Sequence, residues 1–481
     1  MSDLLDRRAP NGTRPTGTLP ISYTCAGCGY HAAAGHPVPL RCPQARPDDD
    51  IDHVMTRDLD LARLHFPTGF EEDPFLRYRT LFHAWHLALT LGWTDADYVA
   101  LVRRFDAAIA AVDGSGFRTT PFGRNAALSE RLGFAHDAGV YVKDETGNVS
   151  GSHKARHLMG TLLELELADA FAEATAGAPP AVRRLAIASC GNAALAAAVV
   201  AAAAGRDLDV FIPTDAHPGV VARLGALGAH LTVCERDPGV PGDPTVRRLR
   251  SALEAGAVPF TCQGNENGFA IEGGLTLGYE LATDLAAAGF ALDRLFVQVG
   301  GGALASSTIE GLAEARRLGA STADPRIHPV QARSVAPLAR AHERLAHRLD
   351  TDTPTSADMA WAARHRSAFM WPWETEPHSI ASGILDDETY DWLAIVRGTL
   401  ASGGSPVVVD EATLLEANDI ARSTTGIDVD PTGSAGLAGL LELRRHGLVG
   451  SNETVAVIFT GVRREMPSVA DPLGTHVGGE R

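Results

Sequence analysis

Residues 143–160 read KDETGNVSGSHKARHLMG, and the interpretation of the whole chain starts from this stretch. Lys154 follows the small residues Gly151 and Ser152, which favour a tight turn, and precedes a run with helical spacing. A lysine between a turn and a helix can present its amine to a carbonyl compound and form a Schiff base. The alternative is an ordinary surface lysine, and the rest of the sequence decides between the two.

Composition narrows the class of protein. The length of 481 residues predicts two or three structural units. The net charge of −17 argues against broad binding of nucleic acid or anionic membranes. The N-terminus lacks the apolar core of a signal peptide, the longest apolar run is too short to span a membrane, and the six cysteines form no disulfide framework. We therefore expect a cytoplasmic protein without nucleic-acid or membrane partners.

The first fifty residues contain a cysteine knuckle, Cys25-Ala-Gly-Cys28, and then Cys42. Such a knuckle is half of a zinc ribbon, whose other half is a second knuckle. No fourth cysteine follows Cys42 in that pattern. We expect a degenerate extension without metal, with the alternative that His31 or His36 completes a zinc site.

The middle of the chain alternates between strand and helix patterns. Residues 48–60 look like an acidic linker, and helical spacing follows at residues 75–91 and 100–111. A short β-prone run at 140–143 enters the lysine stretch. Strand candidates then occur at 184–189, 209–213 and 230–234, with helix candidates at 193–204 and 219–227 between them. This alternation predicts a parallel sheet with right-handed crossovers.

Three of the strand candidates end at possible ligand sites. The first turn contains Ser189, Cys190, Gly191 and Asn192, and the second contains Gly300, Gly301 and Gly302. Free N–H groups and the helix dipole at such turns attract anions, so the first suits a carboxylate and the second a phosphate. The last strand, at 453–461, places Thr460 at its C-terminal end, where ligands bind in open α/β sheets. The segment 341–376 is a polar insertion whose tryptophans we interpret as packing residues, and Asp410 is a predicted N-cap of a helix at 410–423.

Four features occur in the order typical of one family: the lysine stretch, the Asn192 turn, the tri-glycine turn and Thr460 at the end of the last strand. In this they resemble the fold-type II pyridoxal-phosphate enzymes, the tryptophan synthase β-like group that includes threonine synthases and serine/threonine dehydratases. The resemblance covers residues 118–463. It implies an α/β fold with two parallel-sheet domains behind an N-terminal cysteine-knuckle and helical extension, and a homodimer. The expected division is an extension at 1–50, a helical lead-in at 51–117, a large cofactor domain at 118–180 and 276–465, a small domain at 181–275 and a tail at 466–481.

The resemblance also implies roles for individual residues. Residues 151–156, Gly-Ser-His-Lys-Ala-Arg, are similar to the family's Gly-Ser-Phe-Lys-x-Arg, which makes Lys154 the Schiff-base lysine of pyridoxal 5'-phosphate and the base for the substrate α-proton. Asn192 would bind the cofactor's phenolic oxygen, and Thr460 would face its pyridine nitrogen. The phosphate would lie on Gly300, Gly301, Gly302, Ala303 and Leu304. The substrate carboxylate would lie on Ser189, Cys190, Gly191, Asn192 and Ala193, and its side chain near Ser152 and Arg156.

The sequence departs from the family next to the cofactor, at His153, Ala155 and Ala193. His153 is either an added acid/base group or a ring that replaces the usual aromatic residue. A hydroxyl at Thr460, unlike a carboxylate, would not hold a proton on the pyridine nitrogen. A hydroxyl at this position therefore favours elimination or replacement over transamination.

The prediction of the reaction type rests on short segments that resemble one or another group of the family. The knuckle followed by Asp52-His53-Val54, and the segment at 430–436, resemble threonine synthases, whereas residues 379–383 resemble the dehydratases. We expect a lyase or transferase similar to threonine synthase that performs elimination or replacement on a small amino acid. The alternatives are a serine/threonine ammonia-lyase, a specialised β- or γ-replacement enzyme, an inactive ligand-sensing scaffold and a nucleotide-binding α/β protein.

Overall fold

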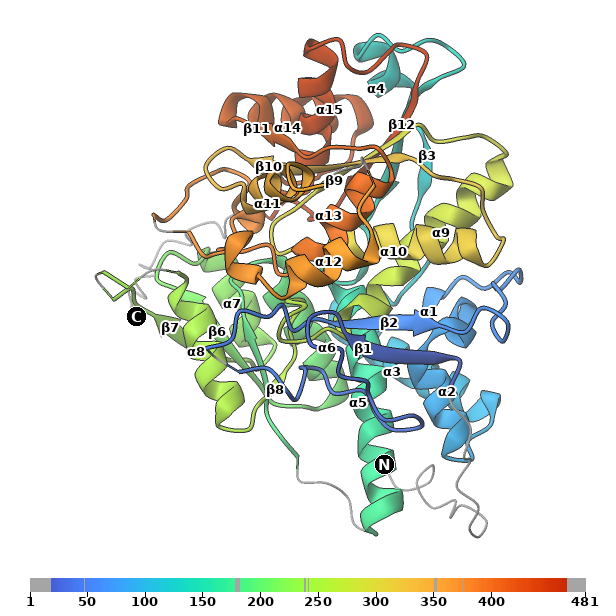
Figure 1. The fold of residues 1–481 in the computed structure, drawn as a ribbon, viewed down its shortest axis with the longest axis vertical. Coiled ribbons are helices and arrows are strands. Elements are labelled where there is room, and N and C mark those ends of the chain that lie inside the picture. The colour runs from blue at the N-terminus through green and yellow to red at the C-terminus, as the bar shows by residue number, and fades with distance from the viewer. Residues whose placement is uncertain are drawn as a thin grey trace, which may run out of the picture.

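The computed structural model describes residues 19–464, apart from residues 47, 178–181, 238, 241, 350–352 and 374. Three sheets and the helices around them organise this part of the chain (Figure 1). The predicted tail at 466–481 lies outside the described residues. Within them, no helix is long and apolar enough to cross a membrane.

The described elements follow the predicted alternation. The strands are β1 (Ile21–Cys25), β2 (Met55–Leu59), β3 (Phe122–Arg124), β4 (Gly139–Asp144), β5 (Leu185–Ala188), β6 (Leu208–Pro213), β7 (His230–Cys234), β8 (Val258–Pro259), β9 (Arg294–Gln298), β10 (Arg326–Ala332), β11 (Val407–Val409) and β12 (Thr454–Phe459). The helices are α1 (Pro74–Arg77), α2 (His83–Thr90), α3 (Asp95–Asp113), α4 (Ala126–Arg131), α5 (Lys154–Ala176), α6 (Asn192–Ala204), α7 (Pro218–Ala226), α8 (Pro244–Glu254), α9 (Ala270–Ala288), α10 (Ala303–Arg317), α11 (Pro337–Ala346), α12 (Ser356–Ala363), α13 (Trp392–Ala401), α14 (Glu411–Thr425) and α15 (Ala435–Arg445). The short 3-10 helices are η1 (Arg79–Leu81), η2 (Val149–Gly151), η3 (Arg366–Ala368) and η4 (Ser382–Ile384).

The larger sheet has six strands in the order β11-β10-β9-β12-β4-β3. Its strands are parallel, except that β3 pairs antiparallel with β4. Successive residues of β9 face two different cores: Phe296 packs with residues of α14 and α15, whereas Leu295 and Val297 pack with residues of α9, α10 and α13. Helices thus cover both faces, which is why this strand is buried along its whole length.

The smaller sheet has four parallel strands in the order β7-β6-β5-β8. The strands and helices predicted between residues 184 and 234 are confirmed, and α6 ends at Gly205 in the left-handed conformation. All four strands lie between residues 185 and 259, inside the segment expected to form the small domain. The domain boundaries themselves stay a prediction.

Two predictions for the N-terminal part are wrong. Residues 48–60 are not only a linker, because β2 lies there and pairs with β1 across the expected boundary at residue 50. Residues 75–91 do not form one helix but α1, η1 and α2, with Phe82 extended between the last two. The break has a tertiary cause: the His83 N–H donates to the buried Glu272 carboxylate at 2.7 Å instead of to a helical carbonyl.

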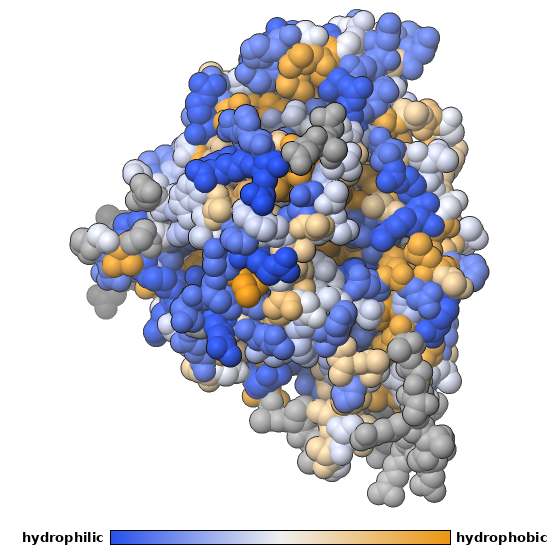
Figure 2. Space-filling model, in the orientation of Figure 1, coloured by the Kyte–Doolittle hydropathy of each residue, from blue (hydrophilic) through white to orange (hydrophobic). Residues whose placement is uncertain are grey.

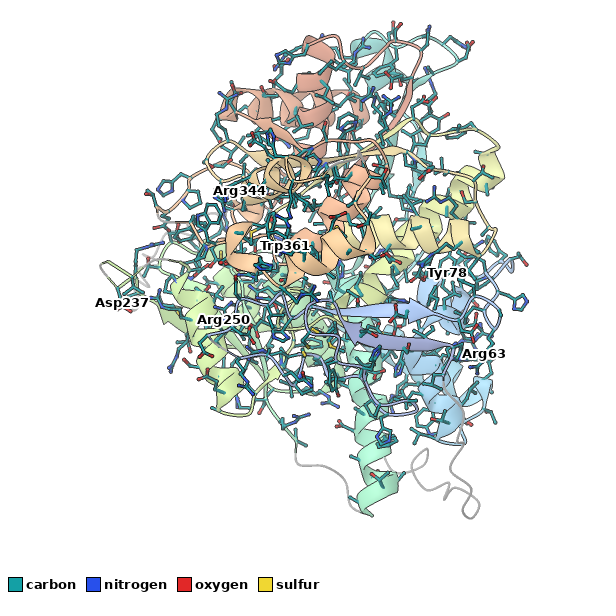
Figure 3. All side chains as sticks on the ribbon, viewed as in Figure 1. Arg63, Tyr78, Asp237, Arg250, Arg344 and Trp361 are labelled. Atoms are coloured by element: carbon teal, nitrogen blue, oxygen red, sulfur yellow. The ribbon has the colours of Figure 1, made fainter. Side chains whose placement is uncertain are left out.

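The predicted polar insertion at 341–376 contains packed tryptophans, as expected. Trp361, labelled in Figure 3, stacks on His365 with ring centroids 4.1 Å apart. The Arg340 guanidinium lies 3.4 Å from the centroid of Trp371, a cation–π contact. On the face drawn in Figure 2, polar residues are spread over the surface and apolar ones form small separate groups.

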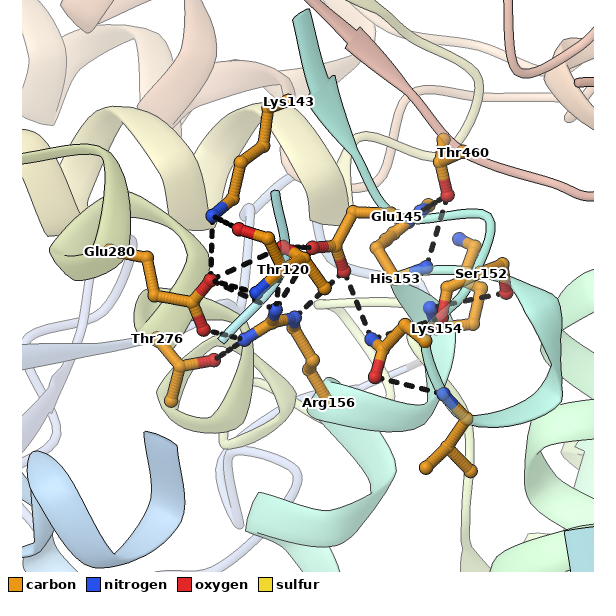
Figure 4. A network of polar contacts seen from close by, with 12 residues as sticks. Thr120, Lys143, Glu145, Ser152, His153, Lys154, Arg156, Thr276, Glu280 and Thr460 are labelled. Atoms are coloured by element: carbon orange, nitrogen blue, oxygen red, sulfur yellow. Dashed lines mark hydrogen bonds and ion pairs between the residues drawn. The ribbon is translucent and has the colours of Figure 1, made fainter. Parts of the chain in front are cut away.

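A buried ionic network joins the lysine stretch to α9 (Figure 4). Arg156 on α5 pairs with Glu145 at 2.8 Å and with Glu280 at 2.6 Å, and Lys143 on β4 pairs with Glu280 at 2.7 Å. All four side chains are fully buried. Burial alone would raise the pKa of Glu280, but Arg156 and Lys143 hold it at about 2. The network therefore carries charge in the interior and fixes β4, α5 and α9 relative to one another.

We predict that Glu280→Gln lowers the free energy of unfolding by about 3–5 kcal/mol, because it removes the carboxylate that Arg156 and Lys143 share and leaves Lys143 only the more distant, partly exposed Asp284. Urea unfolding followed by circular dichroism measures the loss. The matched control is Glu416→Gln, which breaks the exposed pair with Arg445 and should cost less than about 1 kcal/mol. Equal losses in the two variants would contradict the role given to the network.

Candidate active site

The predicted ligand turns meet around the N-terminus of α5. The His153 N–H donates to the Thr460 hydroxyl at 3.0 Å, which joins the lysine stretch to the end of β12. Asn192 lies beside Gly461, since a Cβ on that glycine would be 2.9 Å from the Asn192 amide nitrogen. Asp386, which accepts from the Gly301 N–H at 2.7 Å, also interacts electrostatically with Lys154. One site therefore brings together Lys154, Asn192, Thr460 and the tri-glycine turn.

The turn before Lys154 is strained in a way that requires its small residues. Ser150 has a φ of 57° and is the one non-glycine residue with positive φ in the described chain. Gly151 follows with φ 69°, and a Cβ there would lie 2.3 Å from Val462. Such strain is concentrated at functional sites and persists only where the surrounding structure fixes it. Here the strained turn lies directly before α5, which begins at Lys154.

Lys143 and Lys154 are the only lysines in the sequence. Lys143 is fully buried and held by Glu280, so its amine is engaged within the fold. Lys154 is half-buried, and of the described residues none forms an ion pair with its amine. Its amine is therefore the lysine nitrogen that the fold leaves available for a ligand.

The tri-glycine turn has the properties of an anion seat. It leads from β9 into α10, whose N-cap Gly302 has φ 106° and no side-chain cap, so the first N–H groups of the helix stay available. A Cβ on Gly300 would lie 2.2 Å from a carboxylate oxygen of Asp386. Burial raises the pKa of Asp386, while Lys154 opposes this rise. The structure thus already places one anionic group at this turn, between its backbone and Lys154.

The turn at 189–193 offers a second seat. Gly191 begins α6 without a side-chain cap, and residues 189–193 are all half-buried. Free N–H groups at the start of a long helix suit a carboxylate. Burial raises the pKa of the Cys190 thiol to about 11, so this cysteine is not a thiolate nucleophile at neutral pH. The Asn192 side chain is held from both ends: Arg464 donates to its oxygen at 2.9 Å, and its amide donates to Asp430.

His153 is a neutral ring at the base of the site. Burial, and then the charge of Lys154, hold the pKa of His153 well below its usual range. Its Nδ1 lies 2.8 Å from the Thr460 hydroxyl (Figure 4). Its Nε2 is buried and has no hydrogen-bond partner among the described residues. The ring is therefore neutral near pH 7 and keeps one nitrogen without a hydrogen-bond partner among the described residues.

The expected substrate role of Arg156 does not fit the structure. Its guanidinium donates to Glu145, Glu280 and Thr276 in a fully buried place, which leaves it no exposed N–H for a substrate. Ser152 is buried too, and its hydroxyl accepts from the Lys154 N–H at 3.4 Å. Glu272 is likewise structural, since it pairs with Arg57 at 2.8 Å beneath the N-terminal strands.

Several residues at the site were not predicted. Asp386 and Asp391 both interact electrostatically with Lys154, and burial raises the pKa of Asp391 to about 7. Burial also raises the pKa of Asp430 to about 7. Arg464 reaches Asn192 from the C-terminal side. The sequence held weak signals for two of them: Asp386 follows the run at 379–383, and Asp430 begins the segment at 430–436.

The chemistry of the site fits one kind of ligand. A free amine suits an aldehyde, and the capless turn before α10 suits a phosphate. The unpartnered His153 Nε2 and the Thr460 hydroxyl suit a polar ring at the end of β12. Pyridoxal 5'-phosphate carries an aldehyde, a phosphate and a polar ring on one small molecule.

Comparison with known proteins agrees with this interpretation. The family model described as "Pyridoxal-phosphate dependent enzyme" matches residues 115–461. The threonine synthase of Methanosarcina acetivorans is 27% identical over 347 residues, which are 71% of this chain and 74% of that protein. The threonine synthase of Synechocystis is 27% identical over 361 residues, 73% of this chain and 78% of that protein.

Solved structures share the fold. The processed form of threonine deaminase isoform 2 from Solanum lycopersicum superposes with a TM-score of 0.53 at 15% identity, covering 78% of this chain and 91% of that one. Diaminopropionate ammonia lyase from Escherichia coli superposes with a TM-score of 0.55 at 17% identity, covering 76% and 88%. With the family model matched over most of the described chain, the protein belongs to the family of pyridoxal-phosphate dependent enzymes.

Proposed function

We propose that this enzyme catalyses elimination or replacement on a small amino acid in the manner of a threonine synthase, with Lys154 as the residue that holds the cofactor. The observation that supports the proposal is the half-buried Lys154, whose amine interacts electrostatically with Asp386, the carboxylate that accepts from the tri-glycine turn. The threonine synthase relatives support the reaction class.

When bound, pyridoxal phosphate supplies an electron-withdrawing ring that stabilises negative charge on the substrate's α-carbon. The chain's own groups do the rest. The N–H groups at the start of α10 would hold the phosphate, and those at the start of α6 would hold the substrate carboxylate. The Lys154 amine would hold the cofactor, and it would also take the substrate α-proton and return it to the product or the leaving group.

Thr460 would determine whether the pyridine nitrogen of the bound cofactor is protonated. Its hydroxyl already exchanges hydrogen bonds with the backbone and ring of the neutral His153. A hydroxyl paired with a neutral ring does not stabilise a proton on a pyridine nitrogen as a carboxylate would. We therefore propose that the site favours loss or exchange of a substituent over transamination.

The charged groups around Lys154 fit two kinds of substrate, one phosphorylated and one with a second amine. A phosphorylated substrate needs a cation, and Arg464 takes the place that we expected of Arg156, because it reaches the site beside Asn192. In contrast, Asp386, Asp391 and Asp430 are carboxylates around the same space, which suits a substrate with a second amine. The second candidate function is therefore ammonia elimination from a diamino acid, as the name of the Escherichia coli relative in fold states for that protein.

A substrate panel separates the candidates. We predict that, with pyridoxal phosphate, the enzyme converts O-phosphohomoserine to threonine and inorganic phosphate, and that Lys154→Ala lowers kcat by about 10²–10⁴-fold or more. Phosphate release, amino-acid analysis and 2-oxo-acid assays are run on O-phosphohomoserine, serine, threonine and 2,3-diaminopropionate. Ammonia and 2-oxo acid from the diamino acid alone would favour the second candidate. No product from any of the four would contradict both.

Asp386 provides a second test, because its carboxylate accepts the Gly301 N–H that a phosphate would need. We predict that Asp386→Asn tightens binding of pyridoxal phosphate about tenfold or more, since like charges at close range repel strongly. In the wild type, affinity should rise as pH falls through the raised pKa of Asp386, and the variant should lack this dependence. Absorbance titration with the cofactor gives both values.

The matched control for this test is Asp387→Asn. Asp387 is adjacent in sequence, but it accepts from the Tyr390 hydroxyl at 2.6 Å rather than from the turn. It should leave cofactor affinity near the wild-type value. Weaker binding in Asp386→Asn than in this control would show that Asp386 helps to hold the cofactor instead of competing with it.

We also propose a cytoplasmic homodimer. None of the six cysteines forms a disulfide in the structure, which is usual for a reducing compartment. The dimer rests on the resemblance to the family, and light scattering behind size-exclusion chromatography tests it.

A further inference from the structure

Four metal-binding side chains meet at the end of the N-terminal strands. Cys25, Cys28, Cys42 and His53 place one sulfur or nitrogen atom each within 4.8 Å of all the others. Cys25, Cys42 and His53 are buried, with 1, 2 and 7% of their surface exposed, and Cys28 is half-buried. Sulfur atoms, yellow in Figure 3, gather beside these strands. Cys25 and Cys28 share one knuckle, whereas Cys42 and His53 come from separate segments that the fold brings to it.

Two of the distances between these atoms match those of a tetrahedral zinc site, and the others lie within 4.8 Å. Metal–sulfur bonds of ~2.3 Å and a metal–nitrogen bond of ~2.0–2.1 Å place two sulfurs ~3.8 Å apart and a sulfur and a nitrogen ~3.6 Å apart. The Cys28 and Cys42 sulfurs are 3.6 Å apart, and the Cys25 sulfur is 3.5 Å from His53 Nδ1. A disulfide would need its sulfurs at ~2.05 Å, so this spacing is that of ligands around a common centre.

The imidazole of His53 is oriented as that of a metal ligand. Its Nδ1 faces the sulfurs, while its Nε2 lies 3.0 Å from the Asp49 carboxylate. A histidine that binds metal through one nitrogen usually donates the other N–H to a carboxylate, which fixes the ring and strengthens the ligand. The cluster therefore contains the supporting residue as well as the four ligands.

The alternative in which His31 or His36 completes a zinc site does not fit the structure. His31 Nδ1 lies 2.8 Å from the Thr24 hydroxyl on the exposed side of β1. His36 packs its ring on Phe171, with centroids 4.8 Å apart. His53 lies beyond the expected extension, next to β2, and reaches the cysteines only because β2 pairs with β1.

The backbone around the knuckle also holds the Cys25 sulfur in place. The N–H groups of Gly27 and Cys28 donate to the Cys25 sulfur. Gly29 has φ 74°, the left-handed turn that closes the knuckle, and a Cβ on Gly27 would lie 2.4 Å from Ile51. These contacts fix the Cys25 sulfur at its place in the cluster.

We propose that Cys25, Cys28, Cys42 and His53 bind one structural Zn²⁺ ion in a closed tetrahedral site. Four protein ligands leave no position for substrate or water, so the ion takes no part in the reaction. This inference is independent of the proposed function.

The ion would fix a segment that contacts two other parts of the fold. Between the ligands, the Leu40 carbonyl accepts from the Gly268 N–H at 2.9 Å, just before α9. Next to His53, the Asp52 N–H donates to the Ala363 carbonyl at 2.7 Å, and its carboxylate pairs with Arg366 at 3.3 Å. The metal therefore holds together a segment that contacts α9 on one side and the α12–η3 region on the other.

The test measures metal in the purified full-length protein by inductively coupled plasma mass spectrometry. We expect about one zinc per chain in the wild type and in the controls His31→Ala, His36→Ala and Cys234→Ser. Cys28→Ser and His53→Ala should lose most of it. Asp49→Ala should weaken zinc affinity about 10–100-fold in competition with a chelator, because it removes only the supporting carboxylate.

Cobalt substitution keeps the test valid if a ligand variant folds poorly. Wild-type protein loaded with Co²⁺ should show the strong visible bands of tetrahedral thiolate coordination, and Asp49→Ala, which keeps all four ligands, should show them at higher cobalt concentration. Wild-type protein without zinc that also gives no such bands, or a Cys28–Cys42 disulfide found by mass spectrometry in freshly purified protein, would overturn the proposal. Loss of zinc in His31→Ala or His36→Ala but not in His53→Ala would overturn the ligand set.

Discussion

The position of Lys154 depends on the ion pairs of Arg156, two residues further along α5. Arg156 binds Glu145, in the connection that enters the turn, and Glu280, in the neighbouring helix α9. Because the three side chains are buried, the start of α5 cannot shift against β4 or α9 without separating charges in a low-dielectric interior. The first turn of α5 is thereby fixed, and with it the direction of the Lys154 side chain.

The same network explains why the amine of Lys143 is ion-paired within the fold whereas that of Lys154 is not. Lys143 lies on β4 and completes the charge balance of Glu280. Lys154 lies past the strained Ser150–Gly151 turn, and its amine forms no ion pair with the described residues. Structure and function are divided between the two: one amine neutralises a buried acid, and the other is left for a ligand.

The parts of the site that follow from short sequence signals were predictable. A glycine turn after an apolar strand, an asparagine at a helix start and a hydroxyl at the end of the last strand each have a local cause. The strand and helix alternation between residues 184 and 234 was predictable for the same reason. Parallel strands place their carboxyl ends at one edge, so separate turns could be expected to meet.

The predictions that failed depended on contacts between residues far apart in the sequence. Arg156 looked like a substrate ligand because its partners, Glu145 and Glu280, are placed by the fold and not by spacing. His53 joins the cysteines only through the pairing of β1 with β2, and the helix at 75–91 breaks because Glu272 accepts an N–H from far away in the sequence.

The assignment of Lys154 is tested most directly by reducing the protein with borohydride in the presence of pyridoxal phosphate and mapping the labelled peptide by mass spectrometry. Because the chain has only two lysines, the result is unambiguous. The structure predicts a yellow protein with one pyridoxyl group on Lys154 and none on Lys143. A protein that stays colourless with added cofactor, or a label on Lys143, would contradict it.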